Sequence, residues 1–431
     1  MHACPPLLRR IFSLLLLVTV SFGAACPSAL AISGLFLPEP TWEDSSPTNF
    51  DPVRQQLDRM FSIFHTMGAS VAVFREGEII FLHTYGLRER KQASQEPLPV
   101  TEDTLFQVAS ISKMVAGIGL MVLADEEKVT LETDIGHIMG FPMRNPAYPD
   151  TPITLRQLMS HTAGLRDPGL YQSALSGSPF PLSKAFQAPY LRNLFLAKME
   201  PGKLDEYSNF GGGLAGSLIE ALSEETLDHY MQQRVFMPLD ITAAYQPGLL
   251  PENAKVANMY AMPSRRLTKQ HDKKAPLLPG PDPEHNYVLT AGKLFISAPD
   301  LAKILIMLCD NGIYQDTRIL NASTAREMRT LQSGRGSVHG TANRGLYMNI
   351  ITNHQVEGRT LYGHGGKANG MLCAAYFDPL DRTGVVMLTN GCNNSPVYQH
   401  VGLLGRRILQ ICYDTLLDPL AQNESPWLVA Q

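Results

Sequence analysis

The chain has 431 residues, of which 44% are hydrophobic and 18% are charged, a composition that builds a buried core and excludes an intrinsically disordered chain. Its 36 Lys and Arg residues are outnumbered by 40 Asp and Glu residues, which gives a formal net charge of −4. This balance lacks the strongly positive surface on which nucleic-acid binding depends, so we expect no nucleic-acid partner.

The N-terminal segment has the three parts of a secretory signal peptide. Arg9 and Arg10 precede an apolar run at 11–25, and small residues follow at 29–31. The order of these parts predicts export to the periplasm or the medium, with cleavage after Ala31. The apolar run is shorter than the ~20 residues that span a bilayer. An uncleaved signal anchor is the alternative, and it is the only membrane contact that the sequence predicts.

Downstream of the signal, local patterns predict a helix and then a strand pair. Residues 32–48 are rich in Pro and Ser and form a predicted linker. Apolar side chains at helical spacing predict a helix within 50–67. Two strand-like runs at 69–74 and 78–83 are separated by Arg75-Glu76-Gly77, which predicts a hairpin turn.

The middle of the chain is predicted to be mostly helical, and its last third returns to strands. Helices are predicted at 110–127 and 209–223, and the charged, Pro-rich stretch 263–286 is a predicted loop. After residue 296 we expect a helix at 299–309, strands at 345–352, 360–364, 371–377 and 384–388, and a closing helix at 400–416. This order predicts an α/β fold in which both ends of the chain build one sheet and the helical middle is an insertion.

The predicted domain spans residues 49–416, and a C-terminal tail follows at 417–431. Its α/β part is expected at about 49–114 and 290–416, and its helical part at about 115–289. Four cysteines remain after export, too few for a disulfide framework, and three pairings are open to them. We interpret them as buried, unpaired side chains.

Ser110-Ile111-Ser112-Lys113 is the first candidate catalytic motif. Residues three apart share a helix face, so the Lys113 amine can reach the Ser110 hydroxyl. A serine hydroxyl becomes a nucleophile only when a neighbouring group takes its proton. The motif alone is weak, because Ser-x-x-Lys is expected about once by chance in a chain of this length, and a solvated helix face is the alternative.

Tyr207-Ser208-Asn209 and His364-Gly365-Gly366 are the second and third candidate motifs. The Tyr207 hydroxyl can shuttle a proton, and Asn209 offers a donor and an acceptor to a substrate amide. Two glycines after the histidine leave backbone N–H groups open to a substrate chain, although a simple turn is the alternative. The similar triplet Tyr347-Met348-Asn349 lies in a predicted strand and is interpreted as sheet packing.

Together and in this order, the three motifs resemble those of the serine β-lactamase and penicillin-binding protein superfamily. The chain is most similar to the class C β-lactamase-like branch, which includes D-Ala-D-Ala carboxypeptidases, D-amino-acid peptidases and esterases. The resemblance runs from about Phe50 to Tyr413. It includes the further stretches 106–110, 158–165, and 291–297 with 300–302.

This resemblance implies an antiparallel sheet flanked by helices, and an acyl-serine mechanism without cofactor or metal. In that mechanism Ser110 attacks a carbonyl group. Lys113 and Tyr207 carry the proton from Ser110 to the leaving group. The backbone N–H groups of Ser110 and Lys367 form the oxyanion hole.

The resemblance also implies a set of substrate-binding residues, with one departure from the family. Asn209 orients the substrate, and His364 takes the position of the lysine in the Lys-Thr-Gly box, with Gly365, Gly366 and Lys367 behind it. No Lys-Thr-Gly triplet occurs in this chain. A histidine is cationic only in part near neutral pH, which weakens the β-lactamase interpretation without removing the hydrolase.

The sequence therefore predicts an exported serine hydrolase that forms an acyl-Ser110 intermediate. The expected partner is a small-molecule or peptide substrate, a D-amino-acid peptide of cell-wall metabolism being the best candidate and a β-lactam the next. A carboxylesterase is the alternative, and a penicillin-binding or sensing protein with little turnover is an alternative of another class. His161 lies far from the three motifs in sequence and is interpreted as structural.

Overall fold

The computed structural model describes residues 50–90, 96–271, 273–274, 277–332, 343–353, 356–368, 370–393 and 401–418. The predicted signal peptide, the predicted linker and the tail beyond residue 418 lie outside these residues. Within the described part of the chain, no helix combines the length and the apolar character that a membrane crossing requires.

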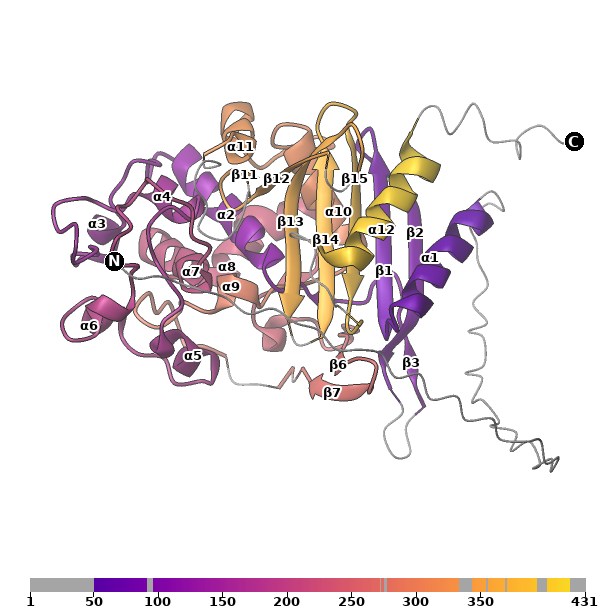
Figure 1. Ribbon diagram of the computed structural model, residues 1–431, viewed down its shortest axis with the longest axis horizontal. Coiled ribbons are helices and arrows are strands. Elements are labelled where there is room, and N and C mark those ends of the chain that lie inside the picture. The colour runs from indigo at the N-terminus through magenta and orange to yellow at the C-terminus, as the bar shows by residue number, and fades with distance from the viewer. Residues whose placement is uncertain are drawn as a thin grey trace, which may run out of the picture. The chain divides into compact units, whose positions relative to one another are not determined.

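One eight-stranded sheet joins the two ends of the domain (Figure 1). Every strand pair in it is antiparallel. In spatial order the strands are β11 (Asn343–Arg344), β12 (Asn349–Thr352), β13 (Thr360–Ala368), β14 (Met371–Asp378), β15 (Thr383–Thr389), β1 (Gly68–Arg75), β2 (Glu78–Glu89) and β3 (Leu98–Pro99). Because β15 pairs with β1, the predicted fold is confirmed: N- and C-terminal segments build one sheet.

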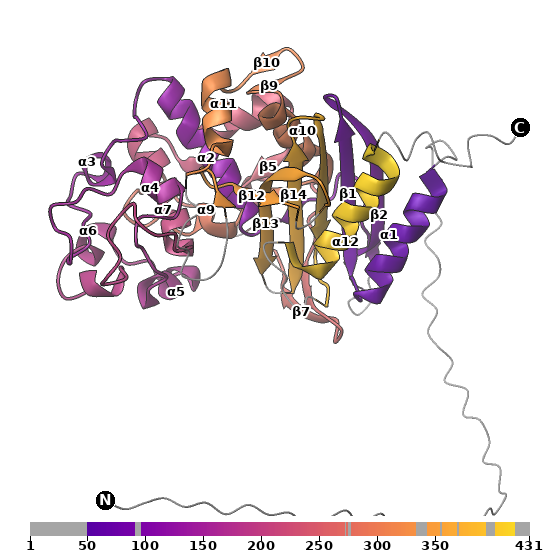
Figure 2. The same ribbon diagram turned by 45° about the horizontal axis from the view of Figure 1, so that its top comes forward.

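Apolar side chains point alternately to the two faces of the sheet along its central strands, and both faces are buried there. Val385 and Met387 of β15 belong to the core on one face, and Val386 and Leu388 belong to the core on the other. The helices α1 (Asp51–Ile63) and α12 (Gly402–Cys412) cover the first face, where Figures 1 and 2 show them side by side, and α10 (Ala298–Cys309) and α2 (Ile111–Asp125) pack on the second. Both faces are thus closed to solvent by helices.

The segment between α2 and α10 forms the helical part. Its longest helix, α7 (Asn209–Ser223), has the predicted bounds. The other helices of this part are α3 (Ile135–Met139), α4 (Leu155–Met159), α5 (Gly169–Leu175), α6 (Leu182–Ala185), α8 (Leu227–Met231) and α9 (Leu289–Gly292). A small three-stranded sheet has the strand order β4 (Phe106–Gln107), β8 (Phe295–Ile296) and β5 (Ala243–Ala244). Two hairpins pair β6 (Met259–Ala261) with β7 (Arg266–Lys269), and β9 (Ile313–Tyr314) with β10 (Thr317–Arg318), ahead of α11 (Ala322–Arg329). The predicted loop at 263–286 therefore contains a strand.

The predicted strand at 345–352 is wrong in its first half. Residues 345–348 form the turn between β11 and β12, because the backbone N–H of Leu346 donates to Met328 O and that of Tyr347 to Met159 O. Tyr347 has a φ of +48°, and its hydroxyl donates to Gly211 O at 2.9 Å. Its interpretation as a sheet residue is therefore wrong: Tyr347 is anchored in the helical part.

Three glycines at the start of α7 let this helix approach its neighbours closely. A Cβ added at Gly212 would lie 2.3 Å from Lys113 Cε, and one at Gly213 would lie 1.8 Å from Tyr287 O. Neither neighbour could move aside into solvent, since Lys113 and Tyr287 are both fully buried. Gly212 and Gly213 thus bring the N-terminus of α7 into contact with α2 and with the segment that precedes α9.

We predict that Gly213→Ala destabilises the protein by about 3 kcal/mol, because the new methyl group meets a backbone oxygen that cannot rotate away. Urea unfolding measures the effect. Gly169→Ala in α5 is the matched control, since a Cβ there meets nothing within 4 Å, and its free energy of unfolding should change by no more than about 1 kcal/mol. Equal effects of the two substitutions would contradict the packing argument.

Candidate active site

Ser110 stands at the turn from a short strand into α2. β4 pairs with β8 and ends at Gln107, and Ala109 then adopts a φ of +44°, a conformation that residues other than glycine rarely take. Ser110 is the N-cap residue of α2, but its side chain makes no capping hydrogen bond. Its hydroxyl is therefore directed to other side chains, and the residue is partly exposed to solvent.

The Lys113 ammonium is fully buried and makes three hydrogen bonds. Its Nζ donates to Ser110 Oγ at 3.0 Å, to Asn209 Oδ1 at 3.0 Å and to Ala291 O at 2.6 Å. An ammonium group has three N–H donors, so these three acceptors satisfy it completely. The acceptors come from the N-terminus of α2, the first residue of α7 and the end of α9, three segments far apart in sequence.

Tyr207 reaches the same hydroxyl from the segment before α7. Its Oη donates to Ser110 Oγ at 2.8 Å. Two cations lie over its ring, Lys113 Nζ at 5.1 Å and Arg344 Cζ at 5.2 Å from the ring centroid. Both groups therefore make cation–π contacts with the ring and help to fix its position.

Arg344 is held in that position by a buried ion pair. Its Nε donates to Asp205 Oδ2 at 2.8 Å and its guanidinium donates to Asn349 Oδ1 at 2.8 Å. Burial raises the pKa of Asp205, and the Arg344 charge opposes that rise. The sequence analysis did not identify Arg344; the only signal was its position three residues before the triplet interpreted as sheet packing.

Asp167 orients Asn209 and was also missed. Its Oδ2 accepts from Asn209 Nδ2 at 2.8 Å, and its Oδ1 accepts from Ser208 Oγ at 3.1 Å and from the Phe210 backbone N–H at 2.9 Å. A carboxylate only accepts, so it fixes the amide of Asn209 with Nδ2 toward itself and Oδ1 toward Lys113. The only signal in the sequence is that Asp167 closely follows the family-like stretch 158–165.

The third motif lies on β13, whose backbone packs against the strand that leads to Ser110. A Cβ at Gly366 would lie 2.2 Å from Val108 O, so only glycine fits there. His364 is buried, with Nδ1 2.6 Å from Gly365 O and its ring centroid 6.3 Å from that of Tyr207. Lys367 is exposed at the end of the strand. The structure therefore brings all three motifs to one place.

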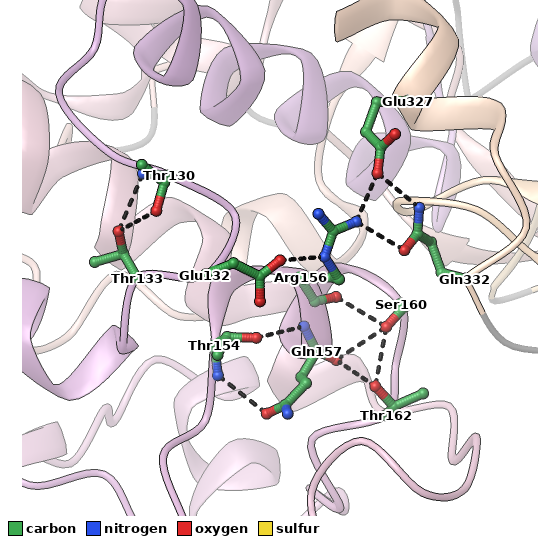
Figure 3. Close-up of polar contacts among 10 residues, drawn as sticks. All are labelled: Thr130, Glu132, Thr133, Thr154, Arg156, Gln157, Ser160, Thr162, Glu327 and Gln332. Carbon is green, nitrogen blue, oxygen red and sulfur yellow. Dashed lines mark hydrogen bonds and ion pairs between the residues drawn. The ribbon is translucent and has the colours of Figure 1, made fainter.

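His161 lies next to this site, at the end of α4. A capping box starts that helix: Thr154 Oγ1 accepts from the Gln157 backbone N–H at 3.2 Å, and Gln157 Oε1 accepts from the Thr154 backbone N–H at 3.0 Å (Figure 3). Ser160 Oγ then donates to Arg156 O at 2.8 Å. These bonds rigidly position the turn that carries His161.

The His161 ring supports Tyr207. The two ring centroids are 4.5 Å apart, and His161 Nδ1 accepts from the Ser208 backbone N–H at 3.4 Å. Burial, reinforced by the charges of Arg344 and Lys113, holds the pKa of His161 well below its usual range. The imidazole is therefore neutral and packs against the ring of Tyr207, in agreement with a structural role.

The described residues contain no cluster of three or more His, Cys, Asp or Glu side chains that could hold a metal ion. The four cysteines Cys309, Cys373, Cys392 and Cys412 are buried and unpaired. This confirms their interpretation as small core side chains.

Comparisons with known proteins agree with this geometry. A family model described as Beta-lactamase matches residues 57–419. A penicillin-binding protein 4 from Amycolatopsis lactamdurans is 26% identical over 360 residues, covering 78% of this chain and 84% of the relative. A putative D-alanyl-D-alanine carboxypeptidase from Escherichia coli K12 is 24% identical over 393 residues, covering 81% of this chain and 86% of the relative.

Solved structures share the fold at lower identity. The octameric penicillin-binding protein homologue from Pyrococcus abyssi has a TM-score of 0.65 and 21% identity, covering 86% of this chain and 77% of its own. The D-amino acid amidase from Ochrobactrum anthropi has a TM-score of 0.63 and 19% identity, covering 84% of this chain and 98% of its own.

We predict that Asp167→Ala lowers kcat/KM at least about ten-fold, since Asn209 is then free to turn its amide and Lys113 loses a fixed acceptor. Steady-state kinetics on any hydrolysed ester measure it. Asp150→Ala removes an exposed carboxylate elsewhere in the helical part and is the matched control. Parallel losses in both variants, or none in Asp167→Ala, would contradict the positioning role.

We predict that His161 makes the free energy of unfolding depend on pH in the acid range. The folded state keeps it neutral, whereas the unfolded chain protonates it near pH 6.5, so its contribution to stability is present above pH ~6.5 and lost as pH falls. His161→Phe should therefore reduce the slope of unfolding free energy against pH between pH 6 and 4.5 by up to about 1.4 kcal/mol per pH unit. Urea unfolding at several pH values measures the slope. Tyr314→Phe removes no group that titrates in this pH range and should keep the parental slope, and a parental slope in His161→Phe would refute the prediction.

Proposed function

The chain belongs to the beta-lactamase family of serine hydrolases, and on this premise we propose that it hydrolyses an amide or an ester through an acyl-Ser110 intermediate. The observation that carries the proposal is the double contact on one hydroxyl: Ser110 Oγ is 3.0 Å from Lys113 Nζ and 2.8 Å from Tyr207 Oη. A serine used only for packing or capping has no need of two such neighbours. The pair supplies what a nucleophilic serine requires.

The hydrogen bonds of Lys113 support Tyr207 as the group that takes the proton. All three N–H donors of Lys113 are engaged, so its nitrogen has no lone pair to offer in this arrangement. For Tyr207 to take this proton it must first be deprotonated, and its contact with Ser110 then reverses direction. The Ser110 proton passes to Tyr207 Oη as Oγ attacks the carbonyl carbon, and Tyr207 then gives that proton to the leaving group. Lys113 and Arg344 lie over the Tyr207 ring, where they are placed to stabilise negative charge that develops at Oη.

The tight packing of β13 supports an oxyanion hole between two backbone N–H groups, those of Ser110 and Lys367. Gly366 in contact with Val108 O fixes the distance between the two segments. A donor of this kind contributes about 2.7–4 kcal/mol to the stabilisation of the transition state. Geometry at Lys367, more than its side chain, then matters for the reaction.

The preferred substrate is the amide bond of a D-amino-acid peptide, of the kind that cell-wall metabolism supplies. The names of the relatives support this choice, because they include a putative D-alanyl-D-alanine carboxypeptidase and a D-amino acid amidase. His364 in place of the lysine of the Lys-Thr-Gly box argues against an efficient β-lactamase. The penicillin-binding relative favours one second candidate, a protein that is acylated by β-lactams and turns over slowly.

One experiment separates these functions. The protein is incubated with a D-Ala-D-Ala peptide, with a fluorescent penicillin and with p-nitrophenyl acetate, and its intact mass is followed. We expect release of D-alanine and a penicillin adduct that decays. A permanent adduct without peptide turnover favours the penicillin-binding protein, and ester turnover alone favours a carboxylesterase.

Variants test the roles of the site residues in the same assay. Ser110→Ala should abolish every activity and every adduct, and Tyr207→Phe should lower the acylation rate about 10²–10⁴-fold, as expected for loss of a general base. Tyr314→Phe in the β9–β10 hairpin is the control. Normal turnover in Ser110→Ala would exclude the proposed mechanism.

A further inference from the structure

A cluster of basic side chains lies beside the site and has no role in the chemistry described so far. Lys269 ends β7, and Lys293 follows α9. The side chain of Gln107 links the two segments, because it bonds both Lys269 Nζ and the carbonyl oxygen of Gly292, the residue before Lys293. His271 joins them, with its ring centroid 4.6 Å from that of Phe295. Segments that are more than 20 residues apart in sequence thus bring three basic groups together.

The cluster lacks any counter-charge among the described residues. The side-chain hydrogen bond of Lys269 goes to Gln107 Oε1, a neutral amide, at 3.3 Å, and no ion pair with a carboxylate is made by either lysine. Both ring nitrogens of His271 are buried without a hydrogen-bond partner. Burial and the neighbouring charge of Lys293 lower the pKa of Lys269 to about 8, and burial and the two lysines lower that of His271 to about 3. Like charges held close together in a partly buried site are unfavourable unless an anion joins them.

Two hydrogen bonds tie this cluster to the backbone around Ser110. Gln107, which binds Lys269, lies three residues before Ser110 and donates from Nε2 to Gly292 O at 2.6 Å. Gly292 itself packs on Ala109, since a Cβ there would lie 3.5 Å from the Ala109 backbone. The preceding residue, Ala291, accepts from Lys113. The lysines therefore belong to the same rigid unit as the nucleophile.

The cluster is also accessible from solvent. Lys269, Lys293 and Gly292 are each partly exposed. The β6–β7 hairpin lies at the end of the β13–β14 hairpin (Figures 1 and 2), where a Cβ at Gly370 would be 2.3 Å from Tyr260 O. A substrate that lies along β13 toward Lys367 thus runs toward this hairpin.

We propose that Lys269 and Lys293, oriented by Gln107, form a subsite for a carboxylate of the substrate, an inference that rests on the proposed hydrolase function. The two ammonium groups match the two oxygens of a carboxylate, and the buried His271 adds a hydrogen-bond donor nearby. The subsite selects acidic substrates and takes no part in the proton transfer at Ser110.

Kinetics with matched esters test the selectivity. Mono-4-nitrophenyl glutarate carries a carboxylate on the acyl chain, 4-acetoxybenzoate carries one on the leaving group, and 4-nitrophenyl pentanoate carries none. In Lys269→Met/Lys293→Met the ratio of kcat/KM for at least one acidic ester to that for the neutral ester should fall about ten-fold. Arg266→Met, which removes an exposed charge from the same hairpin, should keep the parental ratio. Unchanged ratios for both acidic esters would overturn the proposal.

Direct binding separates a failure of the subsite from a failure of the proposed function. Ser110→Ala protein, which cannot turn over, is titrated with glutarate and with inorganic phosphate by calorimetry. We expect saturable glutarate binding that disappears when both lysines are replaced by Met and persists with Arg266→Met. Absence of saturable glutarate binding, or its persistence without the two lysines, would overturn the subsite even if every ester is hydrolysed. Phosphate bound as tightly as glutarate, with unchanged ester ratios, would overturn the assignment to substrate.

Discussion

The buried ammonium of Lys113 is the constraint on which the site depends. A charge removed from water is tolerated only when every donor has a partner, and this one finds its three acceptors in three distant segments. α2, α7 and α9 must therefore meet at one point. Gly212 and Gly213 at the start of α7 are the steric requirement for that meeting, because a methyl group at Gly212 would displace the Lys113 side chain and one at Gly213 would meet Tyr287 O.

Several side chains around Lys113 position the residues that contact Ser110 and do not contact Ser110 themselves. Asp167 fixes Asn209, which then accepts from Lys113, and Arg344 stacks on Tyr207 with Asp205 as its counter-ion. His161 supports the same tyrosine as a neutral ring. The basic groups of the site thus face the reaction, while the carboxylates of Asp167 and Asp205 are already bound by hydrogen bonds or an ion pair. Such an arrangement favours an anionic substrate.

Much of this architecture could be predicted from the sequence, for physical reasons. The strands of the sheet are apolar runs separated by turn residues, and α7 begins at residues typical of a helix start. These local patterns were sufficient to predict both the strands and the helix. The motifs at Ser110, Tyr207 and His364 combined local spacing with a family resemblance, and the structure brings them together. Asp167 and Arg344 were not predicted because each acts through a contact with a residue that is distant in sequence. Asp167 binds Asn209 and Arg344 binds Asp205, and local sequence patterns carry no information about such contacts. The turn at 345–348 was wrongly predicted as a strand because its residues are apolar. These residues pack against the helical part, which is another contact that local patterns do not show.

The central claim is that Ser110 is the nucleophile and that Tyr207, held between Lys113 and Arg344, takes its proton. The most direct test is rapid quenching of the reaction with a penicillin or an active ester, followed by proteolysis and mass spectrometry of the modified peptide. The account predicts one acyl group, on Ser110, that appears at least about a hundred-fold more slowly in Tyr207→Phe. Acylation of another residue, or an unchanged rate in Tyr207→Phe, would contradict it.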